Sequence, residues 1–172
     1  MSWGRTSTGE KVMVDRYLKS FISCALGLMA LLYVAHNLAN WTAAHDFFVY
    51  TTSHADHEAY PVDLLPVPPE PLILIAMLLV FTLEIGAALF LLWGGWTLWQ
   101  ARSADAAAFE AAKTRSRIGA GLAVINWWGL FQAVAVAGYQ LWQSPMGESP
   151  FYGSFFFGAM NMMLLIYLSQ KD

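Results

Sequence analysis

The stretch L72-I-L-I-A-M-L-L-V-F-T-L-E-I-G-A-A-L-F-L-L-W-G-G-W-T-L-W99 decides the fold, because its only charged residue is Glu84. A helix of about 20 apolar residues crosses the hydrocarbon core of a bilayer, so this stretch is long enough to span a membrane. Three further blocks, at 20–35, 118–142 and 151–169, contain no charged residue at all. The sequence therefore predicts a membrane protein with four spanning helices.

The composition of the whole chain agrees with this prediction. Of the 172 residues, 58% are hydrophobic and only 12% are charged, about half the charged share of an ordinary soluble domain. A soluble chain of this length has too little interior to hide four uncharged helices. We expect an all-α membrane protein, a four-helix transmembrane bundle that forms a single domain over residues 1–172. The expected spans are about 19–41, 71–99, 117–142 and 150–169.

The distribution of lysine and arginine predicts the orientation of the bundle. All nine basic residues lie before or at the start of the first span, between the second and third, or after the fourth. The segments 42–70 and 143–149 contain none. Cytoplasmic loops of membrane proteins are enriched in Lys and Arg. We therefore expect a bacterial inner-membrane protein with both termini in the cytoplasm and the 42–70 loop in the periplasm.

Both long connections are predicted to contain helix. In the periplasmic loop, the spacing of apolar residues over 43–52 predicts a short interfacial helix, with Thr42 as its N-cap. The cytoplasmic connection is rich in alanine, with its acidic residues early and its basic residues late, the order that a helix dipole favours. We expect the third spanning helix to begin near Ala104, capped by Ser103, and to run without a break into the membrane.

The segment H54-A-D-H-E58 in the periplasmic loop carries the side chains of a metal site. His54, Asp56, His57 and Glu58 are all residue types that bind zinc, which takes three or four ligands in a tetrahedron. However, their spacing matches no recognised metal signature, and adjacent side chains rarely point at one ion. The sequence leaves two alternatives open, a structured polar loop and a metal site.

Several short motifs, taken in order, resemble a bacterial family of predicted small integral membrane proteins. They are a basic N-terminus, N37-L-A-N-W41, H57-E-A-Y-P61, L83-E-I-G-A-A-L-F-L-L-W-G-G95, F109-E-A-A-K113 and W142-Q-S-P145. This resemblance covers nearly the whole chain. It implies a four-helix bacterial membrane protein of unassigned activity and carries over no catalytic residue.

Polar residues inside the spans are the main candidates for function, because they are costly in lipid and usually face the interior of a bundle. Counting 1.5 Å of rise per residue places Glu84, Asn126 and Asn161 in one layer near the middle of the membrane. With no Lys or Arg at that depth, we expect Glu84 to be neutral or hydrogen-bonded to Asn126 or Asn161. Three roles stay open for Glu84: a hydrogen bond that joins helices, a polar contact for a ligand, and a contact with another subunit.

A second polar layer nearer the periplasm would hold His36, Asn37 and Gln132. Haem ligation through histidine needs an axial His from each of two helices, or a second ligand of another type. His36 is the only histidine within the predicted spans, so we expect no haem held by this chain alone. A haem shared with a partner stays open.

No catalytic constellation is present, which favours a role other than catalysis. The first function hypothesis is an accessory or assembly subunit of a larger membrane complex, whose partner helices would pack on lipid-facing aromatic residues. The second is a membrane carrier or a quinone- or lipid-binding protein that uses the Glu84 layer. The third is a periplasmic metal-dependent activity at the His/Asp loop. The expected partners are the lipid bilayer and other membrane subunits, not nucleic acid. The aromatic residues expected to face lipid are Trp127, Trp128, Phe155, Phe156 and Phe157.

Overall fold

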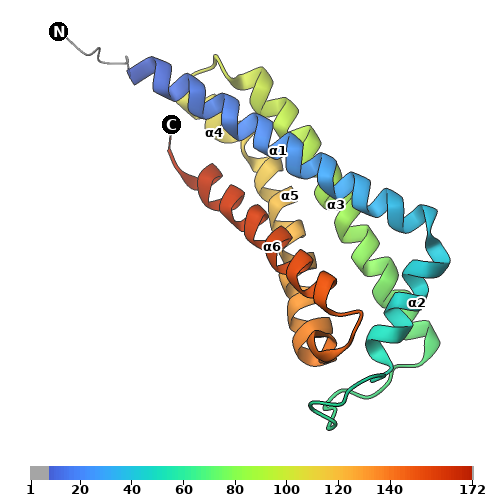
Figure 1. Cartoon of the computed structure of the whole chain (residues 1–172). Helices are drawn as coiled ribbons and strands as arrows, with labels where there is room; N and C mark the ends of the chain where they lie inside the picture. Colours follow the sequence, from blue (N-terminus) through green and yellow to red (C-terminus); the bar gives the residue numbers. More distant parts are fainter. Residues whose placement is uncertain (1–7, 172) are drawn as a thin grey trace.

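The computed structural model describes residues 8–171, and all the regular elements in that range are helical (Figure 1). In chain order they are α1 (Thr8–Ala39), α2 (Trp41–Thr52), α3 (Glu70–Ala101), α4 (Ala106–Ala112), α5 (Thr114–Val124), the π-helix η1 (Ile125–Gly138), the short 3₁₀-helix η2 (Leu141–Gln143) and α6 (Glu148–Ser169).

Four segments of the described chain are long and apolar enough to cross a membrane, which confirms the predicted number of spans. They are Gly9–Ala39, Glu70–Ala101, Ala106–Gly138 and Glu148–Ser169. The first helix begins earlier than predicted, at Thr8, because its polar first turns continue the same helix. Both chain ends lie at one end of the bundle, and α2 with the 53–69 loop lies at the other (Figure 1). We call these two parts the terminal half and the loop half.

The predicted helix over 43–52 is present as α2, but its N-cap is not Thr42. Helix α2 begins at Trp41, directly after the last turn of α1, and Asn40 occupies the N-cap position. The side-chain amide of Asn40 turns back to donate to the His36 carbonyl at 2.8 Å. The two helices are therefore separated by a single residue, and Thr42 lies inside the first turn of α2.

The third spanning segment differs from its prediction at two points. Its first helix is capped by Asp105 and not by Ser103, because Asp105 has extended backbone geometry and its Oδ1 accepts from the Ala108 N–H at 2.8 Å. The segment is also interrupted at Lys113, which separates α4 from α5. From Ile125 to Gly138 the chain then forms a π-helix, a geometry that no sequence pattern had indicated. π-helical turns are rare and recur at functional sites.

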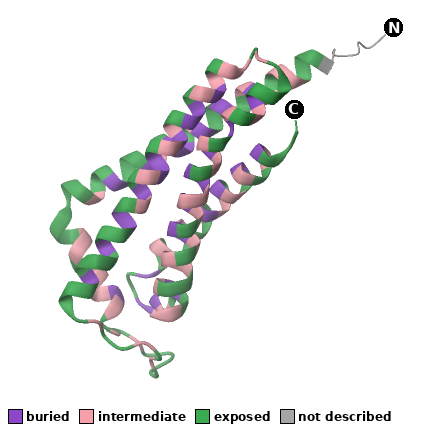
Figure 2. Cartoon of the chain, turned by 180° about the vertical axis from the view of Figure 1, so that it is seen from behind, coloured by how far each residue is buried: buried purple, intermediate pink, exposed green. Residues whose placement is uncertain are grey.

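In the terminal half, glycines at the helix contacts let neighbouring helices pack closely. A Cβ atom at Gly27 of α1 would lie 2.9 Å from the backbone nitrogen of Leu92 in α3, and one at Gly119 of α5 would lie 2.7 Å from that of Leu91. These glycines let the backbones of neighbouring helices meet, as in other membrane bundles. A continuous apolar core fills the rest of this half: Leu26, Leu91, Leu98, Phe109, Ala120, Leu164 and Leu168. Figure 2 shows the buried residues along the inward faces of the helices.

Two cations, the buried Lys113 and the half-buried Arg117, bind the carbonyls at the end of α6. Lys113 Nζ donates to the Gln170 carbonyl at 2.8 Å, and Arg117 Nη2 donates to the Leu168 carbonyl at 2.6 Å. The same two side chains bind the carboxylate of Glu110. Carbonyls at a helix C-terminus lack partners within the helix and favour positive charge. These contacts fix α6 to α4 and α5.

Candidate functional site

Glu84 lies on the inward face of α3. This face repeats at heptad spacing through Met77, Phe81, Glu84, Ala88 and Leu91, all of them buried. The Glu84 side chain is only 1% exposed, so the surrounding helices have removed it from solvent and lipid. A carboxyl group in such a place is costly unless its oxygens find partners.

The two oxygens of Glu84 have different surroundings. Oε2 accepts a hydrogen bond from Asn37 Nδ2 at 3.4 Å, whereas Oε1 is buried without a hydrogen-bond partner among the described residues. A direct hydrogen bond from Glu84 to Asn126 or Asn161, one of the arrangements expected from the sequence, is therefore not formed. Helix α1 packs along the length of α3, whereas η1 contacts it much less, so the partner comes from α1.

Asn126 and Asn161 are as deeply buried as Glu84, at 0% and 1% exposure. Neither amide atom of Asn126 has a partner within the described chain. Asn161 donates from Nδ2 to the Phe157 carbonyl of its own helix at 2.9 Å, and its Oδ1 is unpaired in the same range. Buried groups of this kind ordinarily bind water or a ligand.

The helix register supports a shared depth for this layer. In the antiparallel pair α3 and α5, Gly119 meets Leu91 and the next contact joins Ala87 to Ala123. One further turn along both helices brings Asn126 level with Glu84.

The predicted outer layer is only partly assembled. His36 and Asn37 lie in the last turns of α1, where His36 is exposed and Asn37 is half-buried and turned toward Glu84. Gln132 instead joins η1 to α6, where its Nε2 donates to the Phe151 carbonyl at 2.6 Å and to Ser154 Oγ at 2.8 Å. It belongs to a helix contact rather than to the surface around Glu84.

A cavity of about 450 Å³ opens directly beside Glu84. It lies between α1, α2, α3, η1 and α6 in the loop half, and we call it the Glu84 cavity. Its polar wall is one face of α1, formed by Tyr33, His36, Asn37 and Asn40. A volume of this size lies within the range of about 300–1,000 Å³ that is usual for small-molecule sites.

Aromatic rings line the rest of the Glu84 cavity, and Tyr33 of the polar wall packs against them. Tyr33 of α1, Trp127 of η1 and Phe157 of α6 meet with centroid distances of 4.8 Å (Tyr33–Phe157) and 5.0 Å (Trp127–Phe157). Phe131 packs on Trp127 at 5.2 Å. The prediction that Trp127 faces lipid is wrong, since it is 7% exposed and packs into this cluster. Phe157 likewise turns one side to the cavity.

Of the other aromatic residues expected at the lipid surface, Phe155 and Phe156 are in fact exposed, each by about half of its area. Trp128 lies against Gly158 and stacks on Phe155, with its indole nitrogen donating to the Phe155 carbonyl at 3.1 Å. The outward aromatic surface is therefore smaller than the sequence indicated.

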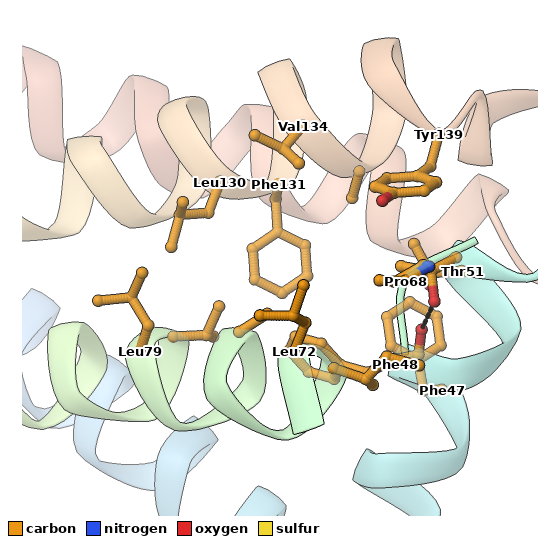
Figure 3. Close-up of a pocket in the computed structure, with 15 residues that line it drawn as sticks. Phe47, Phe48, Thr51, Pro68, Leu72, Leu79, Leu130, Phe131, Val134 and Tyr139 are labelled. Carbon is orange, nitrogen blue, oxygen red and sulfur yellow. Dashed lines mark hydrogen bonds between the residues drawn. The ribbon is translucent and has the colours of Figure 1, made fainter. Parts of the chain in front are cut away.

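A second cavity of about 270 Å³ lies between α2, α3 and η1, and its lining is almost wholly apolar. We call it the apolar cavity. Figure 3 shows Leu130, Phe131 and Val134 of η1 facing Leu72 and Leu79 of α3, with two phenylalanine rings of α2 at one side. It shares four lining residues with the Glu84 cavity, namely Phe47, Phe48, Val80 and Phe131.

The histidines of the loop meet at an aspartate that the sequence had not singled out. His57 Nδ1 lies 2.8 Å from Asp63 Oδ1, and His54 Nδ1 lies 3.5 Å from Asp63 Oδ2. Gln140 Nε2 also donates to Asp63 Oδ1, at 3.1 Å. Asp63 thus connects the loop to the segment between η1 and α6.

The four predicted metal ligands are not brought together. Asp56 accepts from the hydroxyl of Tyr50 at 2.9 Å, and the Glu58 side chain is exposed. His54 and Asp56 both have a left-handed backbone, with φ of 61° and 60°, which turns successive side chains apart. Within residues 8–171, no group of three or more His, Cys, Asp or Glu side chains is placed to hold a metal ion.

Comparison with known proteins places the chain in a family. The sequence model described as "predicted small integral membrane protein (DUF2165)" matches residues 15–171. The chain belongs to this family. DUF2165 membership covers all four spans and both cavities, and it confirms the resemblance seen in the sequence motifs. No curated protein and no solved structure matches the chain. The function of this DUF2165 protein must therefore be argued from its own geometry.

Proposed function

We propose that this protein binds a lipid-soluble small molecule of the quinone or lipid type, whose polar head contacts Glu84. The observation that supports this most strongly is the buried carboxyl of Glu84: its Oε1 has no partner among the described residues, and Glu84 lines a cavity bordered mainly by aromatic rings and amides. Pockets for such ligands combine apolar walls with a few placed polar groups.

A purely structural role for Glu84 agrees less well with its contacts. A carboxyl that joins helices should use its oxygens between them, because an unpaired buried acceptor costs about 1–3 kcal/mol. Here a single hydrogen bond of 3.4 Å reaches Asn37, and open volume lies beside the side chain. A ligand hydroxyl that donates to Oε1 would give both carboxyl oxygens of Glu84 a hydrogen-bond partner.

The test uses the purified full chain in lipid nanodiscs and three probes: an alkylated hydroquinone, its dimethyl ether, and a fatty acid of similar length. We expect the hydroquinone to bind best, because it alone offers neutral hydroxyl donors. Replacing Glu84→Leu should weaken that binding by about tenfold or more, the effect of losing one buried hydrogen bond to a polar ligand.

Glu148→Leu is the matched control, since Glu148 is exposed and does not line the Glu84 cavity. Equal binding of all three probes, or unchanged hydroquinone binding after Glu84→Leu, contradicts the proposal.

The role of accessory or assembly subunit is the second candidate. It is favoured by Phe155 and Phe156, neighbouring rings on the outside of α6 that a partner helix could cover. In mild detergent, an accessory subunit should co-purify with other chains in constant proportion. A protein that purifies only at the mass of its own monomer argues against this role.

The orientation is also a proposal: a bacterial inner membrane, both termini in the cytoplasm, and the 42–70 loop in the periplasm. It rests on the basic residues, which within the described chain all belong to the terminal half: Lys11, Arg16, Lys19, Arg102, Lys113, Arg115, Arg117 and Lys171. In a Cys24→Ser background, a membrane-impermeant thiol reagent applied from outside should label Ala55→Cys but not Ala106→Cys. The reverse pattern contradicts this orientation.

A further inference from the structure

The Glu84 cavity and the apolar cavity are divided by a thin partition. Phe48 from α2, Val80 from α3 and Phe131 from η1 line both spaces. Each of these side chains therefore has open volume on two sides. Phe48 and Phe131 are only partly buried and pack at the edge of a small buried cluster formed by Val34, Met77, Val80 and Phe81.

We infer that the ligand has a single apolar chain, which passes the partition at Phe48 and Phe131 and occupies the apolar cavity while the head contacts Glu84. This inference rests on the proposed function and adds to it the class of ligand: a compact uncharged head, with a hydrogen-bond donor, on one hydrocarbon chain. The chain and the head are accommodated on opposite sides of Phe131.

The distribution of polar atoms supports this division. The apolar cavity has the hydroxyls of Thr51, Thr52 and Tyr139 near its loop end and hydrocarbon elsewhere. Thr52 directs its hydroxyl to the Phe48 carbonyl at 3.0 Å, and Tyr139 donates to the Pro66 carbonyl at 3.2 Å. Thr52 and Tyr139 are thus satisfied by the protein, whereas Thr51 Oγ1 is buried without a partner among the described residues. One unpaired hydroxyl therefore remains at the loop end, and the rest of this space is suited to hydrocarbon.

Charge excludes an acidic head group. Among the described residues that line the two cavities, the carboxyl of Glu84 is the only Asp, Glu, Lys or Arg side chain. A phosphate or a fatty-acid carboxylate would meet no Lys or Arg side chain there, only the imidazole of His36, and it would be buried beside an acid, which is unfavourable. A neutral hydroxyl can donate to Oε1 without that cost.

The partition can open because the α3–η1 contact is weak in the loop half. Most of the packing of α3 is with α1 and α5, and the rings at the partition are held mainly by other rings, such as Trp127 on Phe131. Figure 3 shows the Phe131 ring projecting from η1 into the space toward α3. Rotation of this side chain requires no change in the helix positions.

Photolabelling locates the hydrocarbon chain of the ligand directly. An alkylated hydroquinone with a photoreactive diazirine on its last carbon is irradiated with the full-length protein in nanodiscs, and the labelled residues are identified by mass spectrometry. We expect saturable labelling of residues that line the apolar cavity alone and are shielded from the outer surface, such as Thr51, Ile73 and Leu130. An excess of the same hydroquinone without the diazirine should abolish this labelling.

Two alanines of η1 give a matched pair of variants. Ala135 lines the apolar cavity, whereas Ala133 is exposed and lines neither cavity. Ala135→Trp should reduce labelling of Ile73 and Leu130 by about tenfold, since the indole fills the space, and Ala133→Trp should leave it unchanged. If Ala135→Trp does not fold, a smaller probe lacking the chain should also fail to bind, which separates misfolding from exclusion.

The outcomes distinguish the inference from the function on which it rests. One outcome is labelling that is saturable and depends on Glu84 but falls on Tyr33 or on outward residues such as Leu74. That result overturns the position of the ligand's hydrocarbon chain and leaves the proposed function standing. Labelling that is not saturable, or that Glu84→Leu does not change, overturns both.

Discussion

The two halves of the bundle differ in how closely their helices pack and in the residues that form the contacts. In the terminal half, glycines bring α1, α3 and α5 into backbone contact, and buried lysines close the end of α6. In the loop half, aromatic rings lie around two cavities, and Glu84 lines one of them. The difference indicates that the helices are most closely packed in the terminal half, whereas the loop half holds the proposed binding surface.

This division follows from the physics of the bilayer. Helices in lipid gain little from the hydrophobic effect when they associate, so close packing and hydrogen bonds must hold them together. A bundle that is closely packed at one end can therefore keep volume open at the other. The three predictions below test this contrast, starting with the largest effect.

The largest effect is expected in the terminal half, for Gly119→Ala. The new Cβ would lie 2.7 Å from the backbone nitrogen of Leu91, so α5 and α3 must separate. We expect the free energy of unfolding to fall by about 1–3 kcal/mol, the usual cost of overpacking. Unfolding in mixed micelles of denaturing detergent measures the change.

Gly121→Ala is the control on the same helix, because no atom lies within 4 Å of its added Cβ. It should leave stability unchanged or raise it by up to about 1 kcal/mol, since alanine favours helix. Equal destabilisation by both variants would show that the terminal half is not held by this close contact.

A smaller effect is expected at the loop, for Asp63→Ala. Asp63 contacts His54 and His57 and accepts from Gln140, so its removal frees the loop from the η1–α6 connection. At about 0.5–1.5 kcal/mol net for a hydrogen bond, the loop should lose about 1–2 kcal/mol of local stability. Faster amide hydrogen exchange over residues 57–66 would report this loss.

Glu58→Ala is the control for the loop, because Glu58 is an exposed acid of the same segment. It should leave exchange unchanged. If Asp63→Ala also leaves exchange unchanged, Asp63 does not anchor the loop.

The fold could be predicted from sequence because the bilayer constrains helices strongly. Four blocks with at most one charged residue each suffice to predict four spans, since a spanning backbone must satisfy its own hydrogen bonds. Residue counting also placed Glu84 and Asn126 at one depth, and the register of α3 and α5 agrees with this. Depth depends only on the rise of the helix, which is constant.

The partners of those residues could not be predicted, because they depend on how the helices rotate and how far apart they lie. Glu84 meets Asn37 of α1, which residue counting had assigned to a different layer. Trp127 turns inward although its neighbours suggest a lipid-facing surface. The π-helix η1 changes which residues share a face of the helix, and no sequence pattern predicts it.

The loop shows the same limit on a smaller scale. The cluster of acids and histidines was visible, but the sequence gives no reason to choose Asp63 over Asp56 as the partner of the histidines. The choice depends on the left-handed backbone at His54 and Asp56, a conformation that histidine and aspartate tolerate better than most residues but do not require.

The central claim is that Glu84 serves binding rather than folding, and the free energy of unfolding of Glu84→Leu without added ligand tests it most directly. Leucine has a similar size and removes a buried oxygen that lacks a partner, while Asn37 stays partly exposed in the cavity, where water can replace its lost acceptor. The free energy of unfolding should rise by about 1 kcal/mol. The substitution removes the cost of an unpaired buried group, about 1–3 kcal/mol, and loses the contribution of one hydrogen bond. A loss of about 1 kcal/mol or more would contradict the account, because Glu84 would then hold the helices together.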